Sequence, residues 1–185
     1  MKNAKKILIQ SLPALILAST LSSLGGIGLT LVKPKLIVIL PLVILFPALN
    51  DMIGDYGAIL GSKFTTWLYR GSIPTHWYRS KKLKNLVKNV LLIALFYSFL
   101  ISFLAISISS IQGFPLTFSL ILKVTIVTVL TTLSLVILLS LTIFSLGIFF
   151  YKKGFDPDNI LIPLATSIAD FGALAIFGTL IYFFF

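Results

Sequence analysis

The stretch "IPLATSIADFGALAIFGTLIYFFF", from Ile162 to Phe185, closes the chain and decides the class of fold. It is long and apolar enough to cross a bilayer, because a spanning helix needs about 20 such residues. Asp170 nevertheless lies near its middle. A carboxylate at membrane depth costs at least about 2.5–3.5 kcal/mol, and such residues usually serve a function. This segment therefore predicts both a membrane fold and a site.

The composition of the whole chain supports a membrane protein. Hydrophobic residues make up 58% of the 185 residues and charged residues only 11%, whereas soluble domains have about 45–50% and about 25%. The net charge of +10 comes from basic residues that lie mostly in short loops between apolar runs. This pattern indicates topology control and contact with the lipid bilayer, and we expect no nucleic-acid partner. The chain has no cysteine, so disulfides and thiolate metal sites are excluded.

Five apolar segments predict an all-α integral membrane protein with five transmembrane helices in a single domain, without a soluble regulatory domain. The expected spans are about 7–32, 36–69, 89–111, 116–151 and 160–185. Pro41 and Pro47 predict a kinked or broken second span. Eleven Lys and Arg lie in the regions that an N-in, C-out topology places in the cytoplasm, against Lys33 and Lys35 outside. We therefore expect this topology, in the plasma membrane.

The last segment carries a narrow polar stripe around Asp170. Residues three and four apart share one face of a helix, which places Thr166 and Ser167 one turn before the carboxylate and Pro163 two turns before it. This face should meet protein or water rather than lipid. We expect Asp170, Thr166 and Ser167 to bind a metal ion, and Pro163 and Gly172 to serve pore or helix packing.

The second segment carries a matching stripe. Asp51 and Asp55 are four residues apart, and Asn50 lies beside them; we include all three in the expected metal site. Small residues at spacings of three and four let another helix approach closely, or their carbonyl groups can face a pathway. Both interpretations stay open for Gly54, Gly57 and Gly61, and Pro47 joins the same set.

The expected ligands are all oxygen atoms, which suits hard cations such as Mg²⁺, Mn²⁺ or Ca²⁺. Mg²⁺ fits best because it keeps several waters and needs only one or two carboxylates. Asp156 and Asp158 begin the last segment. Helix capping is the favoured role for these two residues, and a second metal-binding role at the cytoplasmic mouth of the pore is the alternative.

Two motifs resemble a known family. "DPDNILIPLATSIADFGAL" (Asp156 to Leu174) resembles the last transmembrane helix of the MgtE-type divalent-cation transporters and their eukaryotic solute-carrier relatives, and "PALNDMIGDYGAILGSKFTTWLYRGSI" (Pro47 to Ile73) resembles the second. The resemblance implies a homodimer of five-helix protomers, with the ion pathway on the two-fold axis and Asp170 as the central carboxylate. Asp55 stands where the family has Asn. Bacterial members also carry a large cytosolic Mg²⁺-sensing region, whereas about six residues precede the first span here.

These observations favour a transporter or channel for a partly hydrated divalent cation, most of all Mg²⁺, and not an enzyme. One alternative is a non-catalytic membrane subunit of a larger complex. Another is a metal-dependent phosphatidyltransferase-like enzyme, because "NDMIGD" is similar to the carboxylate clusters of such enzymes. That chemistry needs more carboxylates and an Arg near them, and Arg70 and Arg79 lie in the loop instead.

Overall fold

The computed structural model describes residues 2–74 and 76–185, apart from the side chains of residues 2–7, 28, 29 and 31. The described chain forms long helices and no strand, which confirms the all-α expectation. Five helices are long and apolar enough to cross a membrane. They are α1 (Lys2–Val38), α2 (Leu40–Tyr69), α3 (Lys81–Ile111), α4 (Phe118–Lys152) and α5 (Asp158–Phe184), with the short 3₁₀ helix η1 (Trp77–Arg79) before α3.

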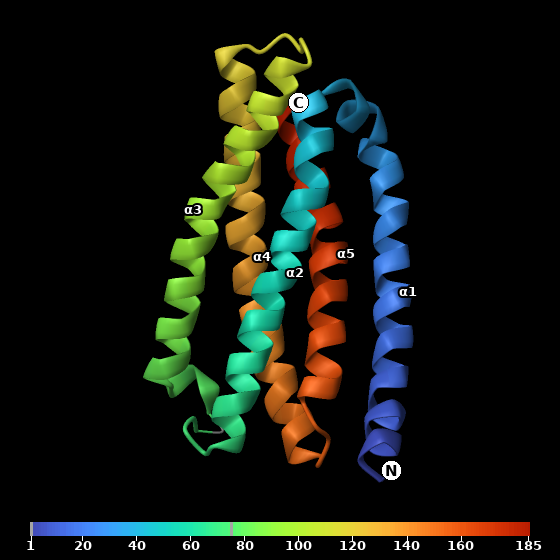
Figure 1. The fold of residues 1–185 in the computed structure, drawn as a ribbon, viewed down its shortest axis with the longest axis vertical. Helices are drawn as coiled ribbons and strands as arrows, with labels where there is room; N and C mark the ends of the chain where they lie inside the picture. The colour runs from blue at the N-terminus through green and yellow to red at the C-terminus, as the bar shows by residue number, and fades with distance from the viewer. Residues whose placement is uncertain (1, 75) are drawn as a thin grey trace.

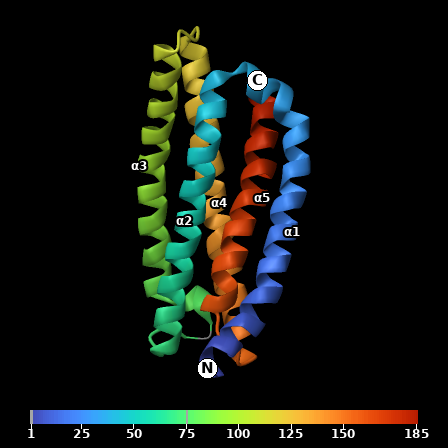
Figure 2. The same ribbon diagram turned by 45° about the vertical axis from the view of Figure 1, so that its right-hand side comes forward.

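The helices form one elongated bundle whose termini lie at opposite ends (Figure 1). In the views of Figures 1 and 2, α1 and α3 lie at the two edges, with α2 and α5 between them. α1 packs mainly against α5, whereas α2 contacts α3, α4 and α5. The centre of the bundle is therefore the junction of α2, α4 and α5.

The helices differ most from the expected spans at the junction of α1 and α2 and at the start of α3. α1 continues through Pro34 to Val38, and Ile39 is the single non-helical residue between α1 and α2. Pro41 lies in the first turn of α2. Backbone N–H groups in the first turn have no partner within the helix, so a proline costs no hydrogen bond there. The third helix begins at Lys81 rather than Asn89, because Ser80 caps it by accepting a hydrogen bond from the backbone N–H of Leu83 at 3.4 Å. The hydropathy pattern marks the apolar part of a helix and not its polar first turns.

The core holds α2 against α4 and α5. Its largest fully buried side chains include Phe64 of α2 and Phe144 of α4, whose rings stack with centroids 5.2 Å apart. Gly147 makes room for this pair, because a Cβ at that position would collide with the ring of Phe64. A Cβ at Gly147 would also lie 3.0 Å from the side chain of Leu161 on α5. α2, α4 and α5 therefore pack closely together here.

Candidate functional site

Asp170 of α5 lies where three helices meet. Its Oδ2 accepts a hydrogen bond from the hydroxyl of Ser22 on α1 at 2.8 Å. Its Oδ1 accepts one from the Nδ2 of Asn50 on α2 at 2.7 Å. The carboxylate is partly buried, and both of these donors are neutral. Hydrogen bonds to a charged acceptor are among the stronger ones, so Asp170 joins α1, α2 and α5 at one point.

The amide of Asn50 is only half satisfied. Its nitrogen donates to Asp170, whereas its oxygen Oδ1 is buried and has no partner among the described residues. Leaving a buried acceptor unpaired costs about 1–3 kcal/mol. An unpaired carbonyl oxygen beside a carboxylate is a favourable arrangement for a hard cation, which would satisfy both groups.

Thr166 and Ser167, one turn before Asp170, lie in different surroundings. Thr166 is exposed, and its hydroxyl donates to the backbone oxygen of Pro163 at 2.9 Å. Ser167 is only 1% exposed and donates to the backbone oxygen of Leu164 at 2.9 Å. A hydroxyl that donates to its own helix keeps its lone pairs for another ligand. Of the two hydroxyls, only that of Thr166 lies at an open surface of the protomer.

Asp51 and Asp55 lie on the outer side of α2. Both carboxylates are exposed. The structure brings Asn50 to Asp170 but does not gather these two residues with it. Within the described residues, no three side chains of His, Cys, Asp or Glu come close enough together to hold a metal ion. A single protomer therefore presents one carboxylate at the three-helix junction and not a closed cage.

Comparison with protein families identifies the family to which the chain belongs. The model of a family described as "MgtE: Divalent cation transporter" matches residues 46–185, which is more than half of the chain. The chain belongs to the MgtE family. Among curated proteins and among solved structures, no significant match to the chain is found. Membership establishes a multi-pass membrane protein that transports divalent cations, in a family of transporters and not of enzymes.

The four glycines of the MgtE-matched region that were expected to serve pore or helix packing lie at helix contacts. A Cβ at Gly57 would lie 3.0 Å from the Cβ of Ala165, so α2 and α5 approach closely there. A Cβ at Gly54 would lie 4.0 Å from the side chain of Thr166, and a Cβ at Gly61 would lie 4.0 Å from that of Leu161, both on α5. These three glycines thus form the side of α2 that faces α5. Gly172, on α5, faces α4 instead: a Cβ there would collide with Leu135. Pro47 and Pro163 lie inside α2 and α5.

A second polar cluster lies at the start of α5 in this MgtE protein. Asp156 Oδ1 accepts from the backbone N–H of Asp158 and from the hydroxyl of Tyr69, both at 3.2 Å. Gln10 of α1 accepts from the Nδ2 of Asn159 at 3.1 Å. Asp156 thus serves the first turn of α5 and ties it to α2. Asp158 is exposed.

Sequence reasoning missed Ser22 and Gln10. Both belong to α1, which precedes the MgtE-matched residues. The hydroxyl-rich run "STLSS" (residues 19–23) in the first apolar segment was the available signal, because hydroxyls in a membrane helix often bond to a neighbouring helix. It could not name the partner, since Ser22 and Asp170 are 148 residues apart.

Proposed function

We propose that this MgtE protein is a Mg²⁺ transporter or channel of the plasma membrane. It acts as a symmetric homodimer in which the Asp170 carboxylates of the two protomers hold a partly hydrated ion at the two-fold axis. Asn50 and Thr166 supply further oxygen atoms, with Ser167 behind them, and Asp51 and Asp55 attract the ion to the same path. Mn²⁺ and Ca²⁺ are the other cations that this oxygen chemistry accommodates.

The observation that carries the proposal is the incomplete site at Asp170. The carboxylate is held by neutral donors, and the Asn50 oxygen beside it is buried and unpaired. No described cation neutralises the carboxylate within its hydrogen-bond shell. Mg²⁺ keeps most of its waters and needs only one or two protein carboxylates. Two copies of one carboxylate, related by symmetry, meet that requirement.

The exposed stripe on α2 supports the dimer. Asp51, Asp55 and Ser62 are exposed along α2, and Thr166 is exposed on the neighbouring α5. In a lone protomer these polar groups would face hydrocarbon, which is unfavourable for carboxylates above all. A second copy packed around a water-filled path would remove this cost. In a symmetric pair the same stripe would line the path from both sides.

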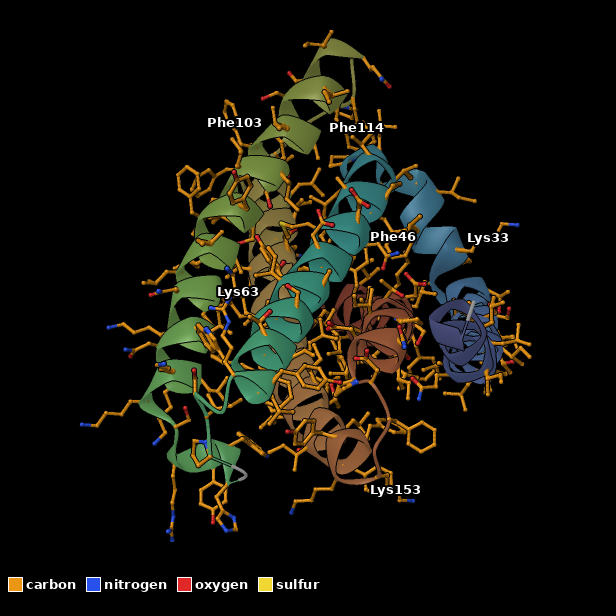
Figure 3. The ribbon with its side chains drawn as sticks, turned by 60° about the horizontal axis from the view of Figure 1, so that its bottom comes forward. Lys33, Phe46, Lys63, Phe103, Phe114 and Lys153 are labelled. Carbon is orange, nitrogen blue, oxygen red and sulfur yellow. The ribbon has the colours of Figure 1, made fainter. Side chains whose placement is uncertain are left out.

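The distribution of basic residues supports an N-in, C-out orientation. The start of α1, the end of α2, the start of α3 and the end of α4 lie at one end of the bundle (Figure 1), and they carry most of the Lys and Arg. In Figure 3, Lys153 lies at this end, and nitrogen-tipped side chains extend outward from the first turns of α3. An excess of positive charge marks the cytoplasmic side of membrane proteins.

The test is Mg²⁺ uptake into proteoliposomes by the native chain and by Asp170→Asn, which keeps the size of the side chain and removes its charge. We expect uptake in the native protein and its loss in the variant. Gln112→Glu, the reverse exchange of amide and carboxylate at an exposed position in a loop, is the control and should transport like the native chain. A folded native dimer that carries none of Mg²⁺, Mn²⁺ and Ca²⁺ would overturn the proposal.

A further inference from the structure

An open groove runs along the seam between α3 and α4. In Figure 1, both helices lie on the side of the bundle away from α1. It has a volume of about 660 Å³. Apart from its lysines, its lining is almost wholly apolar and includes Leu91 and Leu95 of α3 with Ile137 and Leu141 of α4. The one hydroxyl of α4 in the lining, that of Ser140, donates to its own helix at Val136 O (2.7 Å). The walls between the two ends of the groove therefore offer little to a polar ligand.

The length of the groove matches one leaflet of a bilayer. On α3 the lining runs from Leu83 to Leu95 and on α4 from Leu133 to Phe144. At 1.5 Å per residue, each wall is about 17–18 Å long. Half of a hydrocarbon core of about 30 Å is about 15 Å. A groove of this length accommodates an acyl chain that enters from one membrane surface and ends near the midplane.

The end of the groove at the start of α3 is positively charged. Lys84 and Lys88 line it, and both are exposed. They are four residues apart and so lie on one face of α3. Trp77 and Tyr78 lie beside them, and such aromatic residues are typical of the level of the lipid headgroups. The sequence has no Asp or Glu between Asp55 and Asp156, so neither α3 nor α4 supplies a carboxylate to these ammonium groups.

We propose that this groove is a binding site for one anionic phospholipid. The phosphate of the headgroup lies between Lys84 and Lys88, and one acyl chain fills the seam between α3 and α4. This ligand is complementary to both parts of the groove: its negative charge pairs with the lysines at one end, and its acyl chain fits the apolar walls, which extend over about one leaflet. The proposal is independent of the ion path at Asp170, which lies between α1, α2 and α5.

A second copy of the chain fits the groove less well. Parallel copies that meet along α3 and α4 about a two-fold axis would bring Lys84 and Lys88 of each protomer to the same level. Four ammonium groups would then face one another without any carboxylate, because both helices are free of acidic residues. Each lysine near an anionic lipid surface instead gains about 1 kcal/mol, which is about fivefold in affinity.

The experiment measures lipid bound to the detergent-solubilised full chain by native mass spectrometry, with phosphatidylglycerol and phosphatidylcholine of identical acyl chains. We expect the native chain to prefer phosphatidylglycerol about tenfold or more. Lys84→Gln with Lys88→Gln should abolish this preference. The control, Lys81→Gln with Lys82→Gln, removes the same charge from exposed residues of the same helix that do not line the groove, and should keep the preference. Equal effects of the two double variants would overturn the site, since only the general surface charge would then matter.

Two further variants separate the lipid from other occupants. Ile137→Trp fills the groove at a half-exposed position and should weaken the binding of both lipids. Glycerol phosphate, which has the headgroup chemistry without the chains, should not displace bound phosphatidylglycerol at equal concentration; displacement would make this a phosphate site only. Because the chain has no cysteine, Ile137→Cys is a clean probe of contact between copies. A disulfide-linked dimer through this residue would refute the lipid site and assign the groove to a second copy.

Discussion

The tetrapeptide Asp-aromatic-Gly-Ala occurs twice in the chain, and the two copies point in different directions. In α5, Asp170 is partly buried and receives two hydrogen bonds, whereas Phe171 is 41% exposed. In α2, Asp55 is exposed and Tyr56 is only 5% exposed. The same residue types are thus rotated about their helix axes. Helix packing, and not the local sequence, therefore decides which carboxylate lies at the three-helix junction.

The largest expected effect separates the two carboxylates. Asp170→Asn should lower the Mg²⁺ flux, or raise the half-saturating Mg²⁺ concentration, by at least about a hundredfold. The variant removes a charged ligand from both protomers, and this loss should exceed the effect of about 10–100-fold that losing an outer partner has. Asp55→Asn should lower the Mg²⁺ flux less, since the Asp55 carboxylate is exposed and attracts the ion only at a distance. Uptake assays on both variants measure the difference. Equal losses would mean that the two copies of the motif play equal parts.

Substitution of Asn50 should have the next largest effect on Mg²⁺ transport. Asn50→Ala removes both the donor to Asp170 and the unpaired oxygen, so we expect the half-saturating Mg²⁺ concentration to rise about tenfold. Asn85→Ala, on the exposed face of α3, makes the same change away from the junction. An unchanged affinity in Asn50→Ala would show that Asp170 acts without its partner on α2.

The glycines of α2 allow a test of its packing against α5. Gly57→Ala would place a Cβ at 3.0 Å from Ala165, so it should lower the free energy of unfolding by about 1–3 kcal/mol. Gly54→Ala makes the same substitution in the same helix. Its Cβ would lie 4.0 Å from the nearest atom, on Thr166, so we expect little change in the free energy of unfolding. Thermal unfolding in detergent compares them. Equal stability of the two variants would contradict the close approach of α2 and α5.

Ser22 should give the smallest effect. Ser22→Ala removes one of the two donors to Asp170, which corresponds to about 1 kcal/mol, or about fivefold in Mg²⁺ affinity. Ser23→Ala is the control, because Ser23 donates to Ser19 O within α1 and is exposed. Binding isotherms for Mg²⁺ would resolve the pair. A larger loss in Ser23→Ala than in Ser22→Ala would remove α1 from the site.

The fold and the candidate site were predictable to different degrees. Hydropathy alone predicts five helices, because a bilayer imposes one length on every span. The carboxylate of Asp170 stands out for the same reason, since an ionisable group in an apolar run is rare. The partners of Asp170 are harder to predict. Asn50 was in the expected set on α2, but Ser22 lies on α1, and its pairing depends on how α1 lies against α5.

The roles of the glycines show a second limit of the sequence. Their spacing is compatible with a packed face and with a row of carbonyl groups along a pathway. Only the position of Ala165 opposite Gly57 distinguishes contact with α5 from exposure. The start of α3 was predicted too late for a different reason: a cap such as Ser80 and the polar turns that follow it have no hydropathy signal.

The interior hydroxyls of α3 and α4 have a mechanical consequence. Those of Ser98, Ser102, Thr128, Thr131 and Thr132 donate to carbonyl groups of their own helices. In the described residues, hydrogen bonds made by side chains between helices occur instead among α1, α2 and α5. Directional bonds thus lock the register of α1, α2 and α5, whereas shape alone holds α3 to α4. A small slip along the α3–α4 seam breaks none of the side-chain hydrogen bonds between helices that the structure describes, so this half of the bundle is the one that can yield under strain.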